Sequence, residues 1–359
     1  MPVEPIRGRG TSTNPPNRFE RIEYEVDIDV EPHPDAGSDE TPRPRTEFYR
    51  DVSKTIISRN ESPDVGFDAS INPYRGCEHG CVYCYARPFH EYLGMSAGLD
   101  FETRIMVKED APKLLYAELL SPKWVPKVIG ISGVTDAYQP IERQLGLTRQ
   151  CLEVLLEFRN PAVIITKNRL VTRDIDVLSE LSRLTGTTVF ISVTTLDLDL
   201  NRILEPRTSS PAQRLDAISK LARAGVNVGA LVAPIIPGLT DEEVPAILSA
   251  VAKAGARQAS YVMLRLPHAV APLFERWLGE HYPDRKDKIL NRVRSMRGGE
   301  LYKSGFEQRM RGEGFHAEQI KALFRVSCTK AGLNRADWKF DASQFRRPRE
   351  PNEQLGLFS

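Results

Sequence analysis

The sequence predicts an α/β protein built on a parallel β-sheet. Short runs of β-branched and apolar residues alternate with segments whose apolar residues recur at three- and four-residue spacings, the pattern of strands alternating with amphipathic helices. The chain has 359 residues, 41% of them hydrophobic, which is enough to bury a large core. Repeated βα units give right-handed crossovers, and function in such folds lies at the carboxyl ends of the strands.

Six strands and five intervening helices are predicted in order along the chain. The first strand leads into Asn72, and the others span 128–132, 162–166, 188–193, 226–233 and 259–264. The helices span 112–120, 141–158, 172–184, 211–224 and 241–254. The last two end at Gly225 and Gly255, as helix termini often do. Periodicity alone does not distinguish an open sheet from a barrel.

The two ends of the chain differ from this core. Residues 1–50 form an acidic, proline-rich arm that we expect to be largely disordered, apart from one short strand suggested by alternating residues at 23–31. The core spans 51–268, a helical module spans 269–345, and a flexible tail spans 346–359. Within the module, helices are predicted at 271–281, 286–297 and 316–331.

The C-terminal module is basic although the whole chain carries a net charge of +1. Between residues 285 and 349 there are seventeen Lys and Arg residues against seven Asp and Glu residues. Aromatic residues are interspersed among them: Tyr302, Phe306, Phe315, Phe324, Trp338, Phe340 and Phe345. Such a mixture is typical of nucleic-acid binding, with DNA the first candidate. The alternative is a small helical core with a solvated charged face.

Three cysteines lie close together in the sequence. The spacing of Cys77, Cys81 and Cys84 suits three corners of an iron–sulfur cube, with the fourth iron left open. Gly76 and Gly80 allow a tight loop around such a cluster. The alternative is a zinc site completed by His79 or His90, but zinc modules usually present two spaced ligand pairs, and no second pair occurs in the sequence.

This loop, with Tyr83 before its third cysteine and its place near the start of the α/β region, resembles the radical S-adenosylmethionine (radical SAM) superfamily. The resemblance covers roughly residues 65–268. It implies a partial, TIM-like (βα)6 barrel and a [4Fe–4S] cluster held by Cys77, Cys81 and Cys84. It also implies that the open iron binds SAM, and that an electron from a reducing donor splits SAM to a 5′-deoxyadenosyl radical.

The resemblance also implies a set of SAM-binding residues at the strand ends. They are Ser132, Gly133, Thr135 and Asp136 after the second strand, Lys167 after the third, and Ser192 and Thr194 at the fourth. Residues 132–136 also fit a plain βα turn, because Ser, Thr and Asp cap helices. Arg207 is expected to pair with a carboxylate of the cofactor or, alternatively, to bridge to Glu205 or Asp241.

Within the superfamily, the chain is most similar to the DNA-repair-photolyase-like proteins around spore photoproduct lyase. This resemblance rests on residues 77–85, 135–136 and 205–240. It implies a lyase-like DNA-repair reaction in which Tyr83 and Tyr85 relay a hydrogen atom; the alternative is that they pack beside the cluster. The lyase's donor cysteine is missing from residues 132–136, which argues against direct thymine-dimer reversal.

The remaining cysteines have a simpler interpretation. Cys328 is the candidate replacement donor, but a buried cysteine on an amphipathic helix explains it without chemistry. Cys151 is expected to be a small core residue.

The final residues suggest a further partner. Gln354, Leu355, Leu357 and Phe358 resemble the pentapeptide by which bacterial DNA-processing proteins dock on the replication sliding clamp. The alternative is a chance combination of polar and apolar residues.

Composition places the protein in the cytoplasm, because five cysteines without paired spacing fit a reducing compartment. The first residues lack a signal-peptide pattern, and no run reaches the roughly 18 apolar residues of a membrane span. Together with the resemblance, these observations lead us to expect a radical SAM enzyme acting on nucleic acid. Two alternatives remain open: a radical SAM enzyme that modifies a protein or metabolite, and a non-catalytic iron–sulfur protein recruited to the clamp.

Overall fold

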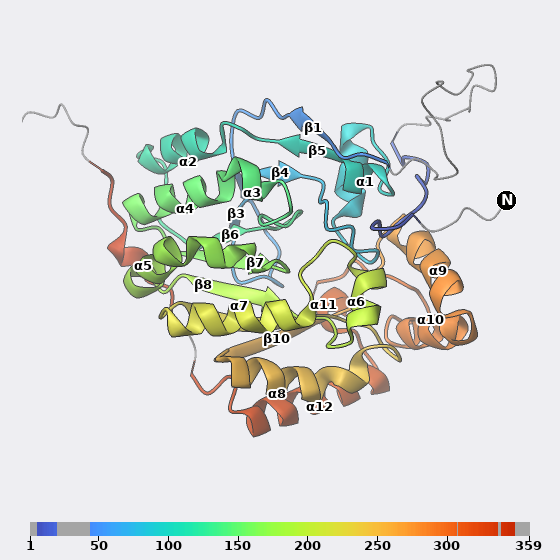
Figure 1. Ribbon diagram of the computed structural model, residues 1–359. Helices are drawn as coiled ribbons and strands as arrows, with labels where there is room; N and C mark the ends of the chain where they lie inside the picture. The colour runs from blue at the N-terminus through green and yellow to red at the C-terminus, as the bar shows by residue number, and fades with distance from the viewer. Residues whose placement is uncertain (1–5, 20–43, 307, 337–338, 349–359) are drawn as a thin grey trace, which may run out of the picture.

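The computed structural model describes residues 6–19, 44–306, 308–336 and 339–348. Its core is a seven-stranded sheet in the order β10-β9-β8-β7-β6-β3-β2 (Figure 1). The strands are β2 (Ile57–Arg59), β3 (Ala69–Ile71), β6 (Ile129–Ile131), β7 (Ala162–Thr166), β8 (Thr188–Ser192), β9 (Asn227–Ile235) and β10 (Gln258–Met263). All neighbours pair in parallel except β2, which runs antiparallel to β3.

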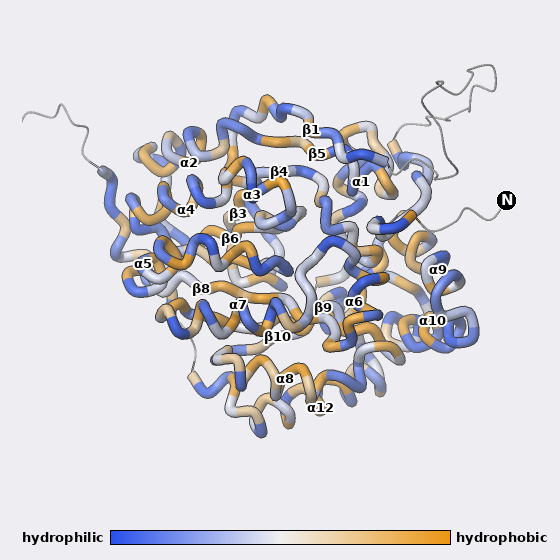
Figure 2. The backbone as a smooth tube through the Cα atoms, in the orientation of Figure 1, coloured by the Kyte–Doolittle hydropathy of each residue, from blue (hydrophilic) through white to orange (hydrophobic). Residues whose placement is uncertain are grey.

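The six parallel strands are the six that the sequence predicts, and the partial TIM-like barrel is confirmed. The central strands are apolar on both faces because helices cover one side and the barrel interior lies on the other. Figure 2 shows the hydrophobic colour along these strands. Ile129, Ile164, Val189 and Ala230 are fully buried.

Five helices cover the outside of the sheet, as predicted. They are α2 (Ala111–Leu120), α4 (Leu147–Phe158), α5 (Ile175–Thr185), α7 (Pro211–Arg223) and α8 (Val244–Ala254). The predicted helix 141–158 is broken, because Gly146 adopts a positive φ of 63° and separates the short α3 (Glu142–Leu145) from α4. The α7 helix begins with a capping box in which Ser210 and Gln213 satisfy each other's backbone N–H groups.

Several short elements around the site were not predicted. A second sheet joins β1 (Glu47–Arg50), β5 (Arg104–Val107) and β4 (Tyr74–Arg75), and the helix α6 (Leu198–Leu204) follows β8. The small α1 helix (Asp100–Thr103) leads into β5. These pieces are too short to show a period in the sequence.

The C-terminal module is helical, and α9 (Val270–His281), α10 (Lys286–Ser295) and α12 (Phe315–Ala331) match the three predicted helices. The short α11 (Gln308–Arg311) was not predicted. The α12 helix packs along α8 (Figure 1). The module's aromatic residues differ in burial, and neither predicted role is tested by this difference. Phe324 is buried against Tyr261, whereas Phe306 and Phe315 are exposed.

Residues 6–19 belong to the predicted N-terminal arm and lie against the cysteine loop. The backbone of Gly10 passes so close to Gly80 that a Cβ on Gly10 would lie 1.7 Å from the Gly80 carbonyl oxygen. The predicted strand at 23–31 falls outside the described residues. Among the described residues, no helix combines the length and apolar character needed to cross a membrane.

Candidate active site

The three cysteines of the motif lie on one loop that follows β4. Gly76 and Gly80 adopt positive φ angles of 78° and 67°, and a Cβ at Gly80 would lie 2.6 Å from a carboxylate oxygen of Glu102. Cys77 and Cys81 are buried, Cys84 is half-buried, and all three thiols are free. The sequence places glycine at the two positions where the loop turns back on itself.

The three thiols lie within electrostatic reach of one another. Burial raises the pKa of Cys84, and Cys77 raises it further. Burial, the carboxylate of Glu205 and both neighbouring thiols raise the pKa of Cys81, while the Lys167 cation opposes them. Three thiols this close together are expected where they bind one positively charged group as thiolates.

Glu78, the residue after the first cysteine, holds the cysteine loop in place through its carboxylate and its backbone N–H. Its carboxylate accepts the N–H of Ile141 at 2.8 Å and pairs with Arg207 at 3.0 Å, and its own N–H donates to Gln139. The N–H of Arg207 donates in turn to the carbonyl oxygen of His79. Arg207 therefore bridges to Glu78, and not to Glu205 or Asp241 as the alternative interpretation had it.

The loop after β6 lies directly beside the cysteine loop. Asn72 accepts the N–H groups of Gly133 and Val134 at 2.9 and 3.1 Å, and Thr135 donates to the carbonyl oxygen of Gly76 at 2.6 Å. A Cβ on Gly133 would meet no atom closer than 3.8 Å, so open space lies beside its backbone. The predicted SAM-binding loop and the cysteine loop thus lie side by side in one site.

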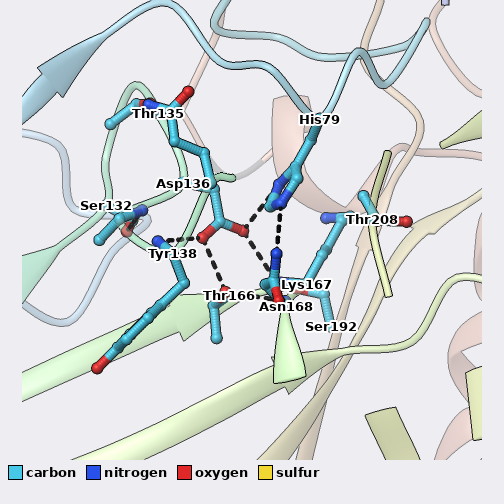
Figure 3. Close-up of polar contacts among 12 residues, drawn as sticks. His79, Ser132, Thr135, Asp136, Tyr138, Thr166, Lys167, Asn168, Ser192 and Thr208 are labelled. Carbon is cyan, nitrogen blue, oxygen red and sulfur yellow. Dashed lines mark hydrogen bonds and ion pairs between the residues drawn. The ribbon is translucent and has the colours of Figure 1, made fainter. Parts of the chain in front are cut away.

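Asp136 lies at the centre of the contacts in Figure 3. Its carboxylate accepts from the hydroxyl of Thr166 and the N–H groups of Lys167 and Tyr138, and it lies 3.4 Å from Nδ1 of His79. Burial alone would raise the pKa of Asp136, but His79 and the N–H donors hold it below its usual range. Asp136 is therefore fully engaged inside the protein, where it joins the cysteine loop to β6 and β7.

Asn168 fixes the other side of the His79 ring. Its Nδ2 lies 3.1 Å from Nε2 of His79, while its Oδ1 accepts the N–H of Leu170 at 3.0 Å. Nδ1 of His79 faces Asp136. Burial alone would lower the pKa of His79, but the Asp136 carboxylate and Cys77 raise it to about 10.

A buried carboxylate, Glu205, supports Tyr83. It accepts hydrogen bonds from Tyr83, Thr194, Asn201 and Arg214, and the Thr194 and Asn201 contacts measure 2.7 and 3.0 Å. Burial alone would raise the pKa of Glu205, but Arg214 in particular holds it at about 2. Tyr83 and Thr194 are thus fixed below the cysteine loop as parts of an ionic network.

Two cations lie over the tyrosines that flank Cys84. Lys167 Nζ lies 5.9 Å from the ring centroid of Tyr83, and the guanidinium of Arg265 lies 4.1 Å from that of Tyr85. Tyr83 is buried, whereas Tyr85 is 42% exposed and donates to the carbonyl oxygen of Gly133 at 2.7 Å. The two tyrosines therefore differ in exposure: Tyr83 is buried, and Tyr85 is partly exposed to solvent.

Ser132 and Ser192, the two serines predicted to bind SAM, both take part in hydrogen bonds at the strand ends. Ser132 has a positive φ of 83°, and its hydroxyl accepts the N–H of Ala137. Ser192 ends β8 and is buried, and its carbonyl oxygen accepts from Arg214 at 3.0 Å.

Two other predictions lie elsewhere. Cys328 is buried near Asn334, which bonds to Ala259 at the amino-terminal end of β10, the opposite edge of the sheet from the cysteine loop. Gln354, Leu355, Leu357 and Phe358 fall outside the described residues, so clamp docking stays a prediction. Cys151 is fully buried in α4, as expected for a core residue.

The arrangement suits a cluster better than a zinc ion. Within the described part of the chain, no three His, Cys, Asp or Glu side chains gather around one point as ligands of a single metal ion. His79, one of the two candidate fourth ligands of a zinc ion, is already held by Asp136 and Asn168. A cluster distributes its thiolate ligands over separate irons, so three nearby cysteines fit it.

The sequence did not reveal the ionic supports of the site. A second buried pair, Arg87 and Glu102, lies at 2.6 Å behind the loop, where Arg87 also donates to the carbonyl oxygen of Cys81. Glu102 further accepts from the N–H of Gly10 and the hydroxyl of Thr11. Such pairs are hard to predict from the sequence, because their two members come together only in the folded chain.

Comparison with known proteins agrees with this geometry. The family model of the radical SAM superfamily matches residues 71–251. An uncharacterized protein of Mycobacterium tuberculosis is 34% identical over 263 residues, covering 72% of this chain and 74% of that protein. An uncharacterized protein of Methanocaldococcus jannaschii is 31% identical over 199 residues, covering 55% and 71%.

Solved structures with a similar fold include spore photoproduct lyase complexed with dinucleoside spore photoproduct. It aligns with a TM-score of 0.58 and 18% identity over 80% of both chains. A mutant of that lyase with bound AdoMet and the same dinucleoside aligns with a TM-score of 0.54 and 16% identity, again over 80% of both chains. At these identities, the likeness establishes a shared fold.

Proposed function

The chain belongs to the radical SAM superfamily, and from this premise we propose that it holds a [4Fe–4S] cluster on Cys77, Cys81 and Cys84, cleaves SAM reductively and acts on nucleic acid. The observation that carries the proposal is the meeting of two loops. The cysteine loop and the loop at Gly133 are joined by the bond from Thr135 to the Gly76 carbonyl oxygen. Together these loops bring the thiols, the uncrowded backbone of Gly133 and the ammonium group of Lys167 into one region.

The cofactors would supply an electron from the cluster and, from SAM, a 5′-deoxyadenosyl radical that abstracts a hydrogen atom. The protein's own groups bind and orient. Lys167, whose ammonium lies near Glu205 and Tyr83, would meet the methionyl carboxylate. The open backbone at Gly133 would receive the amino group.

Asp136 has a supporting role in this scheme. Its oxygens are already occupied, so it holds the loop at Thr135 in place and does not itself meet the SAM ammonium. Ser192 and Thr194 line the end of β8 beside this space, and Thr194 is held by Glu205. Arg207 is held by Glu78 and stabilises the cysteine loop.

Tyr85 is the better placed of the two tyrosines to relay a hydrogen atom. Its hydroxyl is at the loop that would hold SAM, and its ring is partly exposed at the opening. Tyr83 is enclosed by Glu205 and Thr194, which fits the packing interpretation. Cys328 lies at the opposite edge of the sheet and is not placed to donate.

Two features support nucleic acid as the substrate. Solved structures that share this fold include spore photoproduct lyase with a bound dinucleoside. The C-terminal module carries an excess of positive charge, and its α10 and α11 helices contribute arginines. Phosphate neutralisation by such residues is the main source of affinity for nucleic acids.

The experiment is anaerobic reconstitution followed by reduction with dithionite in the presence of SAM. We expect 5′-deoxyadenosine to form, and to form faster with ultraviolet-irradiated DNA than with intact DNA. Cys81→Ala should lose the cluster absorbance and the nucleoside together, while Cys151→Ala, which alters a cysteine in the core, should keep both. Nucleoside formation that is indifferent to every nucleic acid would refute the substrate class and leave the cofactor chemistry standing.

A further inference from the structure

Arg265 stands out among the arginines near the carboxyl edge of the sheet because it has no acidic partner among the described residues. Arg87, Arg207, Arg214 and Arg309 pair with Glu102, Glu78, Glu205 and Asp64. The guanidinium of Arg265 stacks on Tyr85, and within the described residues its polar contact is the sulfur of Met310 at 3.5 Å. A thioether is a weak acceptor, so most of the donors of this half-buried guanidinium remain available.

A second cation behind Arg265 adds to the positive charge of this corner. Arg297 is buried and donates to the carbonyl oxygens of Leu264 and Gln308 at 2.7 and 2.9 Å. Burial lowers its pKa to about 10, and the nearby charge of Arg265 contributes to this shift. Two guanidinium groups therefore share a corner of the site, and no carboxylate of the described part of the chain pairs with Arg265.

A pocket of about 440 Å³ opens in the same corner. It is lined by His268, Glu300, Tyr302, Lys303, Ser304, Gly305 and Gln308. The rings of His268 and Tyr302 lie 6.4 Å apart, and Lys303 is neutralised by Glu313. Gln308 lines this pocket and also binds Arg297, so the pocket and the arginine pair are contiguous. The pocket thus offers aromatic faces and hydrogen-bonding groups next to the Arg265 guanidinium, and the exposed Glu300 carboxylate also lies on its lining.

We propose that Arg265 binds a backbone phosphate of a nucleic-acid strand, with the adjoining nucleotide in the pocket at His268 and Tyr302. Arginine forms bidentate hydrogen bonds to phosphate, and aromatic side chains stack on bases. This proposal rests on the proposed function and adds to it the place where the substrate is held. A phosphate at Arg265 would lie beside Tyr85, which contacts the loop at Gly133.

The test measures binding of the cluster-loaded protein to a fluorescein-labelled single-stranded DNA of about 12 nucleotides, within the size range of single-strand sites. Fluorescence anisotropy gives the dissociation constant at several salt concentrations. Arg265→Gln should weaken binding about tenfold and reduce the slope of log K against log salt by about 0.7, the value for one phosphate contact on a single strand. Arg265→Lys should restore the slope and only part of the affinity, because it keeps the charge without the bidentate geometry.

Two further variants isolate the site. Arg325→Gln removes the same charge from the exposed face of α12 and should change neither quantity. Tyr302→Ala should weaken binding while leaving the salt slope unchanged, because a stacking contact releases no counterions. Equal effects of Arg265→Gln and Arg325→Gln would overturn the proposal, since binding would then follow net charge alone.

Thymidine 5′-monophosphate and SAM, which carry a phosphate and a carboxylate, test which anion Arg265 binds. Thymidine 5′-monophosphate should bind much more weakly than the oligonucleotide and should not compete at equal concentration. If Arg265→Gln weakens SAM binding and spares the oligonucleotide, the guanidinium belongs to the cofactor carboxylate and the proposal is wrong. If the unaltered protein binds no oligonucleotide at all while still cleaving SAM, the proposed substrate class fails, and this site fails with it.

Discussion

Nδ1 of His79 lies 3.4 Å from a carboxylate oxygen of Asp136, and this contact ties the middle of the cysteine loop to the ends of two strands. His79 stands between Cys77 and Cys81, whereas Asp136 follows β6 and binds Thr166 at the end of β7. A shift of either strand end would therefore move the thiols. The positions of the three proposed cluster ligands therefore depend on this contact.

Replacement of Asp136 by Asn should loosen that connection. The variant keeps the size of the side chain but replaces an acceptor oxygen by a donor that faces N–H groups, so we expect a loss of about 1–3 kcal/mol of folding free energy and a lower iron content after reconstitution. Asp176→Asn is the matched control, because Asp176 pairs with Arg149 on the surface and should cost less than about 1 kcal/mol. Equal losses in urea unfolding for the two variants would contradict the assignment.

Neutral His90 makes stability depend on pH. Burial lowers its pKa from 6.5 to about 4, so the unfolded chain binds more protons than the folded protein between these values. The stabilisation is complete above pH 6.5 and is lost as the pH falls towards 4, by about 3 kcal/mol in total.

His90→Phe should remove this dependence, because phenylalanine does not titrate and fits beside Phe101, whose ring meets the His90 ring edge-on. The measurement is the apparent unfolding temperature of both proteins under anaerobic conditions at pH 7, 6 and 5. We expect the difference between the two proteins to shift in favour of the variant as the pH falls. A constant difference would show that His90 is not the titrating group.

Gly133→Ala tests the SAM-binding loop. The added methyl group would lie 3.8 Å from the nearest atoms of Asn72 and Ser70, an ordinary contact, so the fold and the iron content should be unchanged. A ligand that approaches this backbone would meet the methyl group, and we expect SAM to bind about tenfold more weakly, which corresponds to about 1.4 kcal/mol. Unchanged affinity in equilibrium dialysis would place SAM elsewhere.

The two tyrosines should respond differently to loss of their hydroxyl groups. Tyr83→Phe removes a buried donor from Glu205 and should cost about 1 kcal/mol of stability. Tyr85→Phe removes a bond at the partly exposed opening and should leave stability nearly unchanged while slowing product formation. If Tyr83→Phe slows turnover of bound substrate more than Tyr85→Phe does, the assignment of the relay to Tyr85 is wrong.

Gly10→Ala tests the segment that covers the cysteine loop. No side chain fits between Gly10 and the carbonyl oxygen of Gly80, so the segment must lift away. Gly98→Ala should act in the same way, because its Cβ would lie 2.0 Å from the carbonyl oxygen of Thr13. We expect the cluster absorbance of both variants to bleach several times faster in air.

Gly66→Ala is the control for this pair, since a Cβ there meets no atom within 4 Å and its φ is not in the left-handed region. It should bleach at the rate of the unaltered protein. Identical bleaching in all three variants would mean that residues 6–19 do not shield the cluster.

The predictability of the fold follows from the length and burial of its elements. Strands such as β7 and β9 are largely buried on both faces and largely apolar, so their residues alone identify them. The second sheet is different, because β4 has two residues and β5 has four, and their pairing depends on residues that lie 30 or more positions apart. No local period records such a contact.

Residues of the site could be predicted where they belong to a sequence motif. They could not be predicted where they depend on an ion-pair partner elsewhere in the sequence. The cysteine spacing and the loop at Gly133 are visible in the sequence. The partner of Arg207 is Glu78, 129 residues away, and a sequence offers many carboxylates at such distances. Arg214 and Glu205 were equally hidden, since charged residues are usually expected at the surface.

The contact of residues 6–19 with the cysteine loop also sets an order of assembly. The N–H of Gly10 binds a carboxylate that is 92 residues further along the chain, so ribosomes making 5–20 residues per second need roughly 5–18 seconds to produce its partner. The earliest part of the chain thus waits for a later one. The cysteine loop is complete at Cys84, 18 residues before Glu102, so we expect its outer side to stay open for at least roughly 1–4 seconds at this rate. A proposed cluster could be inserted in that interval, before the cover closes.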